Sequence, residues 1–139
     1  MRQATQTLTI DTRGRGMVEI TRDVTRFVAA QSMTTGLLTV FCRHTSASLV
    51  IMENADPDVR TDLEAYFEVI APEDPGRYIH GYEGPDDMPA HIRTALTQVS
   101  LGVPLVDGRL ALGSWQGVYL FEHRRQPHRR EIVLHLIGE

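Results

Sequence analysis

The segment His80–His91 (HGYEGPDDMPAH) brings two imidazoles and three carboxylates together within one short stretch. Imidazole nitrogens and carboxylate oxygens are ligands for divalent metals, and an imidazole exchanges protons near neutral pH. Gly84 and Pro85 indicate a loop, and Asp86 or Asp87 is predicted to cap a helix that begins directly afterwards. The stretch therefore predicts a loop-to-helix transition that carries chemistry.

The helix predicted after this loop has an apolar stripe in which Met88, Ile92, Leu96 and Val99 recur at helical spacing. His91 falls on the same side, so we expect its imidazole to point toward the core or its rim. One interpretation is a ligand site at this position. The alternative is that His91 only forms a hydrogen bond to a loop carbonyl.

A second polar segment, Arg43–Ala47, separates two apolar runs at 37–42 and 48–52. Both runs are rich in residues that favour strands, and the first is predicted to be covered on both faces. Polar groups held beside a core are either hydrogen-bonded or used to bind a ligand. The polar segment is therefore predicted to contribute to the same site.

A divalent metal is one ligand that these two segments predict, with His44, His80 and His91 as the candidate metal ligands. Three imidazoles from a strand end, a loop and a helix would leave positions open for water or substrate. Zinc suits imidazole best, whereas magnesium would prefer carboxylates. The carboxylates available for magnesium are Glu53, Glu83, Asp86 and Asp87. The alternative is a hydrogen-bonded polar cleft without a metal.

Side chains suited to a phosphorylated substrate occur in both polar segments and further along the chain. The candidate substrate-binding residues are Thr45, Ser46, Asn54, Ser114, Trp115 and Gln116. Hydroxyls donate to phosphate oxygens, side-chain amides present both a donor and an acceptor, and an indole stacks on a ring. The alternative for Trp115 is that it fills a gap in the core.

Arg43, His44 and Asp87 are the candidate catalytic residues. Negative charge that develops on a leaving group can be stabilised by an arginine or a protonated histidine. Asp87 is predicted to act as a general base or a metal ligand, and the alternative is that it only caps the helix.

Periodicity places these residues among strands and helices. Residues 3–10 alternate as a strand, and Thr21 is predicted to cap the first helix. Asp56 and Pro57 have the pattern of a helix cap followed by a first helical residue. The buried stripe predicted for this second helix comprises Val59, Leu63, Phe67 and Ile70. Asp107-Gly108 is typical of a two-residue hairpin turn.

The order of elements predicts an α+β fold of mostly antiparallel strands with about three flanking helices, in one domain at 1–139. The net charge of −4 argues against nucleic acid as the main partner. The single cysteine, Cys42, excludes an intramolecular disulfide and a cysteine-rich zinc site. No apolar run approaches the roughly 18 residues that cross a bilayer, and no apolar leader is visible, so a cytoplasmic location is expected.

A basic run, 123–130 (HRRQPHRR), lies before the last strand. Such a run is most often the solvated end of a hairpin. The alternative is that it supplies positive charge to the cleft of a neighbouring subunit, where an anionic substrate would bind.

Ordered segments along nearly the whole chain resemble the YjbQ family. They are R-H-T-S-A-S-L, E-N-A-D, Y-I-H-G-Y-E-G-P-D-D-M-P-A-H-I, D-G-R-L-A-L-G-S-W-Q-G-V and R-R-E-I-V-L-H-L-I-G-E. Two positions depart from the pattern of the family. Gly81 stands where relatives often have Asn, which removes one side chain from the site, and Ser114 replaces the common Thr but keeps the hydroxyl.

The resemblance implies a β-sandwich-like core flanked by helices, assembly as a homotrimer, and a polar cleft near the subunit boundaries. It also implies a weak secondary thiamine-phosphate synthase activity, which joins a pyrimidine pyrophosphate to a thiazole phosphate and releases pyrophosphate. Two further hypotheses stay open at this point. The same site would suit a metal-dependent hydrolase that uses water as nucleophile, or a non-catalytic module that binds a small ligand.

Overall fold

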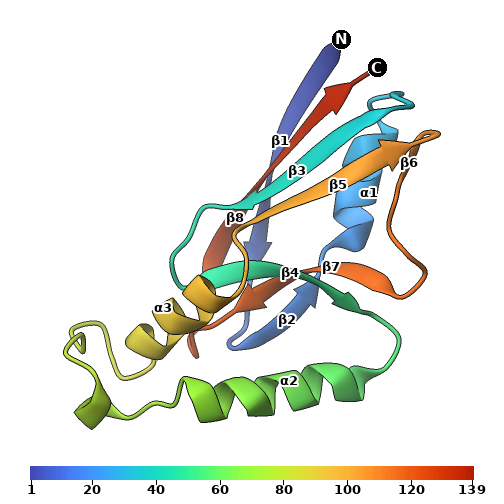
Figure 1. Cartoon of the computed structure of the whole chain (residues 1–139). Helices are drawn as coiled ribbons and strands as arrows, with labels where there is room; N and C mark the ends of the chain where they lie inside the picture. Colours follow the sequence, from blue (N-terminus) through green and yellow to red (C-terminus); the bar gives the residue numbers. More distant parts are fainter.

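Two antiparallel sheets and three helices make up the computed structural model, which describes residues 1–139 (Figure 1). The five-stranded sheet contains, in spatial order, β1 (Arg2–Asp11), β8 (Arg129–Gly138), β3 (Gly36–Cys42), β5 (Ser100–Val106) and β6 (Arg109–Leu110). The three-stranded sheet contains β2 (Gly16–Glu19), β7 (Gln116–Glu122) and β4 (Ala47–Glu53). The helices are α1 (Thr21–Ala29), α2 (Pro57–Ile70) and α3 (Asp87–Leu96), with a 3-10 turn at Pro75–Arg77. The predicted α+β class is confirmed.

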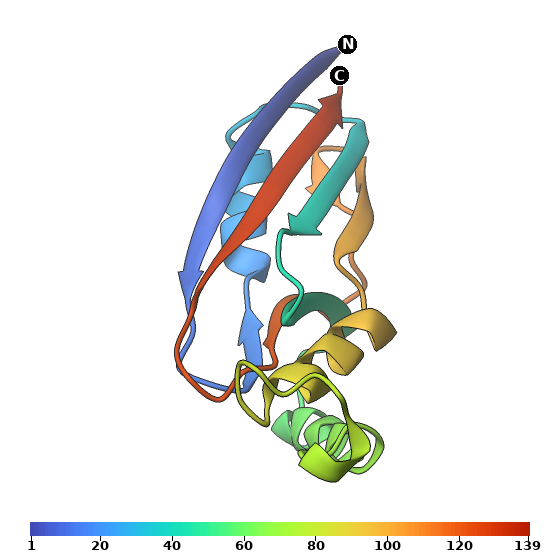
Figure 2. The same cartoon turned by 90° about the vertical axis from the view of Figure 1, so that its left-hand side faces the viewer.

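The elements stack in three layers, which Figures 1 and 2 show from two sides. The inner face of the five-stranded sheet packs on α1 and on one face of the three-stranded sheet, and together they form the main apolar core. α2 and α3 lie against the other face of the three-stranded sheet. In β7 every residue after Gln116 is buried, because this central strand is covered on both faces.

β3 is not the doubly covered strand that its apolar run predicts. Its side chains alternate, and Leu37 and Phe41 are 46% and 43% exposed on the outer face of the sheet. Ile137 of β8 pairs directly with Leu37 and shares this face. No helix of the chain covers the outer face, so an apolar run here predicts a strand correctly but overestimates its burial.

A side-chain cap is found at the start of α2 but not at the starts of α1 and α3. Asp56 accepts a hydrogen bond from the Asp58 N–H, and Pro57 is the first residue of α2, as predicted. Thr21 lies inside α1 instead of capping it, since its hydroxyl accepts from the Val118 N–H. The Asp86 carboxylate does not cap α3 either, because arginine donors occupy it.

The outer two helices bury less apolar surface than their stripes predict. In α2 only Phe67 is buried, and its ring packs edge-to-face on Phe121 with centroids 5.5 Å apart, a contact worth about 1 kcal/mol beyond its area. In the stripe predicted for α3, Met88, Ile92 and Val99 are only partly buried, and Leu96 is 60% exposed. The buried face of α3 instead carries Arg93, whose guanidinium lies near Glu68 of α2. Ion pairing between helices therefore overrides the local apolar pattern.

The hairpin turn at Asp107-Gly108 is confirmed, with positive φ angles of 49° and 78° that suit a type I′ turn. The ends of the chain lie side by side because Arg2 pairs with Gly138 across β1 and β8. No helix is long and apolar enough to cross a membrane.

A buried carboxylate joins four segments at the corner where the two sheets meet. Glu122 ends β7 and accepts hydrogen bonds from the Thr12 hydroxyl and from the guanidinium of Arg130. Arg130 also donates to the carbonyl and hydroxyl oxygens of Ser46, which precedes β4. Burial acts to raise the pKa of Glu122, but the hydrogen bonds from Arg130 and Thr12 outweigh it and hold the pKa below its ordinary value.

We expect Glu122→Gln to lower the free energy of unfolding by about 3 to 5 kcal/mol, because Arg130 would keep a buried charge without its counter-ion. Urea denaturation of the variant and of Glu131→Gln, an exposed position on β8 next to Arg130, measures the difference. The control should stay within about 0.5 kcal/mol of the parent. A loss no larger than that of the control would contradict this account.

The same carboxylate sets an expected pH dependence. Because the pKa of folded Glu122 lies below its ordinary value of 4.5, its contribution is complete above that pH and is lost as pH falls through the depressed folded pKa. The stability difference between parent and Glu122→Gln should therefore shrink on acidification, as urea titrations at a series of pH values would measure.

Candidate functional site

Three connections meet at one end of the three-stranded sheet, on the left of Figure 1. They are the β3–β4 connection at 43–46, the segment 78–86 that leads into α3, and the β7–β8 connection at 123–128. Hydrogen bonds described below join all three. Residues far apart in sequence are therefore brought to one surface, as the positions of 43–46 and 80–91 predict.

His80, Asp87 and His91 form the centre of this site. One oxygen of Asp87, Oδ2, lies 2.7 Å from His80 Nε2 and 3.0 Å from His91 Nε2. The Asp87 side chain is only 2% exposed, whereas those of His80 and His91 are 41% and 31% exposed. The three ligand atoms lie within 4.8 Å of one another, a spacing at which they could hold a single metal ion.

The ring of His91 is held in one tautomer by the polar segment before β4. Its Nδ1 lies 2.7 Å from the carbonyl oxygen of Thr45, and because a carbonyl only accepts, Nδ1 carries a proton. In neutral His91 the lone pair of Nε2 then faces an oxygen of Asp87. Two acceptors at 3.0 Å need a cation between them, either a second proton on the ring or a metal ion.

Asp87 keeps its negative charge in this environment. Burial acts to raise its pKa, but the hydrogen bond from His80 and the charges of His91 and Arg124 outweigh burial and hold the pKa below the usual range. Arg124 donates from Nη1 to Oδ1 of Asp87 at 2.9 Å. The carboxylate thus offers Oδ2 to the imidazoles while Oδ1 is occupied.

His44 does not join the other two histidines, contrary to the predicted set of three metal ligands. Its Nε2 accepts a hydrogen bond from the backbone N–H of Glu131 at 2.7 Å. The proton of the neutral ring must therefore sit on Nδ1, which has no partner in the chain. Burial and then the charge of Arg130 lower the pKa of His44 below its ordinary 6.5, so the ring is neutral near pH 7.

A groove of about 730 Å³ runs from these residues along α3. Its lining comprises Phe41, Cys42, Arg43, His44, Thr45, His91, Thr94, Ala95, Thr97 and Val99. Arg43, His44, Thr45 and His91 thus share one concave surface, as the sequence predicts. Burial raises the pKa of the Cys42 thiol to about 11, so Cys42 is a protonated core residue and not a nucleophile.

Two of the predicted substrate-binding side chains near the groove have other roles. The Ser46 hydroxyl is buried and accepts from Arg130. Thr45 contributes its backbone carbonyl to His91, while its side chain lies exposed at the groove. The four expected magnesium carboxylates do not form one site either, because Glu83, Asp86 and Asp87 lie around Arg124, which pairs with all three, and Glu53 lies at the far end of β4.

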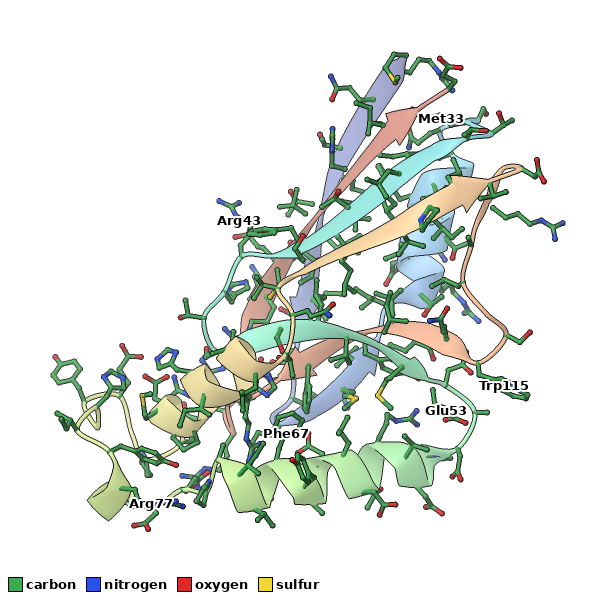
Figure 3. The ribbon with its side chains drawn as sticks, viewed as in Figure 1. Met33, Arg43, Glu53, Phe67, Arg77 and Trp115 are labelled. Carbon is green, nitrogen blue, oxygen red and sulfur yellow. The ribbon has the colours of Figure 1, made fainter.

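The remaining predicted substrate-binding residues lie at that far end. Glu53 pairs with Gln116, six positions along β4 from Ala47, which at ~3.3 Å per residue is roughly 20 Å away. Asn54 contacts the backbone of Trp115 and Gln116, and Ser114 lies in the loop beside them. Figure 3 shows Trp115 and Arg43 on opposite sides of the molecule. Trp115 is 66% exposed, so it neither fills the core nor reaches the groove of its own chain.

The family described as UPF0047 protein YjbQ-like matches residues 6–139. A protein of this group from Synechocystis is 54% identical over 99% of this chain and 94% of its own length. The chain belongs to this family. YjbQ from Salmonella typhimurium is 44% identical over 96% of this chain and 97% of its own length.

Solved structures place the same fold in other organisms. A hypothetical protein of Aeropyrum pernix has a TM-score of 0.88 and 28% identity, covering 98% of this chain and 99% of its own. A conserved hypothetical protein of Thermus thermophilus has a TM-score of 0.83 and 38% identity, covering 95% of this chain and 99% of its own. The YjbQ-like fold is therefore shown for this chain both by sequence and by structure.

Sequence reasoning missed Arg124 as part of the site in this family member. Arg124 does not stand out in the basic run, because each arginine of the run pairs with a carboxylate of another segment. Beyond Arg124, the ion pairs are Arg125–Glu73, Arg129–Asp11 and Arg130–Glu122. The excess of acidic over basic residues hints at such pairing, but it does not say which arginine meets Asp87.

We expect the His44 ring to stay neutral at pH 6.5, with its proton on Nδ1, since its pKa lies below this value. Long-range ¹H–¹⁵N NMR spectra of the imidazoles report both the tautomer and the titration midpoint. His44→Gln identifies the signals by their loss. A midpoint above 6.5, or a proton on Nε2, would contradict the hydrogen bond from Glu131.

Proposed function

We propose that the protein is a metal-dependent enzyme that acts on a phosphorylated small molecule at the groove beside His91. The observation that carries the proposal is the convergence of His80 Nε2 and His91 Nε2 on Asp87 Oδ2, which places three ligand atoms within 4.8 Å of one another. A backbone carbonyl that fixes the other ring nitrogen is the usual outer partner of a metal-bound histidine.

Zinc is the metal that this ligand set suits best. Two imidazoles and one carboxylate, from His80, His91 and Asp87, match the three-ligand sets of catalytic zinc, which leave a fourth position for water or substrate. Ferrous iron accepts a similar set. A bound metal would supply Lewis acidity and an activated water. Magnesium is a weaker candidate, because it prefers oxygen ligands and two of the three ligands in this cluster are imidazole nitrogens.

The chain's own side chains would bind and orient the substrate. The apolar lining of the groove would hold a ring, and exposed Arg43 at its edge would attract a phosphate. Neutral His44 would donate a hydrogen bond from Nδ1 instead of stabilising the leaving group as a protonated imidazole, which revises the role predicted for it. These contacts support a small anionic substrate.

By resemblance, the reaction is that of a secondary thiamine-phosphate synthase: a pyrimidine pyrophosphate reacts with a thiazole phosphate, and pyrophosphate leaves. Arg43 would then stabilise charge on the leaving group. The open ligand position favours a second candidate on the same residues, a metal-dependent hydrolase in which water is the nucleophile. A cytoplasmic location is part of the proposal, and the one thiol, Cys42, is free and buried.

Metal analysis of purified protein tests the ligand set. We expect near one divalent metal per chain in the parent and a loss of about 100-fold or more in affinity for His91→Ala and Asp87→Asn. His44→Gln is the matched control and should keep the metal, because its ring is bound to the backbone. Metal loss in His44→Gln together with retention in Asp87→Asn would contradict this assignment and favour the three-histidine set.

Turnover separates the two reactions. Thiamine phosphate formed above an Asp87→Asn control supports the transferase, whereas metal-dependent cleavage of phosphate esters or lactones supports the hydrolase. A ligand that raises the thermal midpoint without any turnover would contradict both, and would favour a binding module.

Assembly as a homotrimer is the second part of the proposal. The outer face of the five-stranded sheet carries Leu37 and Phe41 on β3, Ile137 on β8 and Val106 on β5, all exposed in the single chain. An uncovered sheet face with this many apolar side chains is typical of a subunit interface. Three as the number of subunits comes from the family resemblance.

Light scattering at micromolar concentration should give the mass of three chains for the parent. Phe41→Glu places a charge in the proposed interface and should yield monomers. Val59→Glu introduces the same charge on exposed α2, in the opposite layer, and should remain trimeric. A monomeric parent would contradict the proposal.

A further inference from the structure

Arg124 contacts three residues of the segment that carries the site, which are Glu83, Asp86 and Asp87. From the β7–β8 connection its Nη1 donates to Asp87 Oδ1 at 2.9 Å and its Nε donates to Asp86 Oδ2 at 3.0 Å. Its Nη2 donates to the carbonyl oxygen of Glu83 at 3.0 Å. The side chain is only 14% exposed, so these contacts are largely shielded from water.

Because of these contacts, the two carboxylate oxygens of Asp87 have different partners. Oδ1 accepts from Arg124, and Oδ2 faces His80 and His91. A carboxylate without a partner on Oδ1 can rotate about its χ2 torsion, which is a broad, roughly two-fold torsion. With Oδ1 occupied, one defined oxygen is presented midway between the imidazoles.

The same guanidinium fixes the approach of the chain to α3. The Glu83 carbonyl and the Asp86 carboxylate both lie in the loop between His80 and Asp87, and the Arg125 N–H adds a third bond to Asp86. His80 lies outside any helix or strand, so no regular backbone structure holds it in place. Its position relative to Asp87 therefore depends on a loop that Arg124 fastens.

We propose that Arg124 is the positioning residue of the site: it orients Asp87 Oδ2 and the 80–86 loop so that His80 and His91 converge on one ligand. This inference deepens the proposed function and rests on it for the identity of the ligand as a metal. The geometry calls for a guanidinium, because three donors in one plane reach three acceptors at fixed angles. A lysine would keep the charge but not this fork.

Imidazole NMR of the metal-free protein is the first test, because it does not depend on a metal. In Arg124→Met the ¹⁵N signals of His80 and His91 should shift and broaden, since Asp87 is no longer held between them. Arg125→Met removes the same charge from the neighbouring position, where the side chain pairs with Glu73, and should leave both signals unchanged. Arg124→Lys should resemble Arg124→Met, which keeps the test valid if the methionine variant does not fold.

Cobalt(II) binding, followed by its visible spectrum, is the second test. We expect Arg124→Met and Arg124→Lys to lose about 10- to 100-fold in affinity, the usual effect of removing an outer partner of a metal ligand. Unchanged imidazole signals in both Arg124 variants would overturn the inference. If the parent binds no cobalt or zinc, the metal part of the proposed function fails, and the imidazole signals alone decide the role of Arg124.

Discussion

The buried carboxylate of Glu122 is the constraint on which the arrangement of the site depends. Its oxygens accept from Thr12 after β1, from Arg130 in β8, and from the backbone N–H groups of His123 and Arg124. A charged group with no exposure to water must have all of these partners, because leaving it without them costs several kcal/mol. The ends of three strands and the turn after β7 are therefore fixed relative to one another.

The hydrogen bonds around Glu122 also hold the residues that position the site. The N–H bond from Arg124 to Glu122 holds the turn from which the guanidinium reaches Asp87, and Asp87 in turn holds both imidazoles. The charged groups of this series are shielded, with exposures of 0% at Glu122, 14% at the Arg124 side chain and 2% at the Asp87 side chain, whereas the His80 side chain is 41% exposed. Rigid, shielded charges support groups that remain accessible to a ligand, which is the arrangement that preorganised sites require.

The two polar regions at opposite ends of β4 differ in what they can do. At the far end, Glu53 accepts from the N–H groups of Ala55 and Asp56, and Gln116 accepts from the Gly113 N–H. These bonds shape the loops at the start of α2 and before β7. Within one chain this end therefore contributes local structure, whereas the groove lies beside the cluster of candidate metal ligands. Only assembly of several chains would bring the two regions within reach of one ligand.

Local patterns in the sequence determined much of the fold. Alternation gave the long strands, Asp56-Pro57 the start of α2, and Asp107-Gly108 the hairpin, because each depends on interactions between near neighbours in the chain. The same local patterns predicted His80–His91 as the centre of the site. It also allowed both interpretations of His91, and the structure contains the carbonyl bond and the ligand geometry together.

Tertiary structure alone decided which groups meet. Arg124 reaches Asp87 across 37 positions, and the Glu131 N–H reaches His44 across 87, through a sheet register that no local pattern encodes. Which face of α3 is buried was decided in the same way, since Arg93 meets acidic residues of α2 that are distant in sequence. The sequence by itself determined the element types and supplied the reactive residues. Long-range pairing decided that Asp87, and not His44, completes the site.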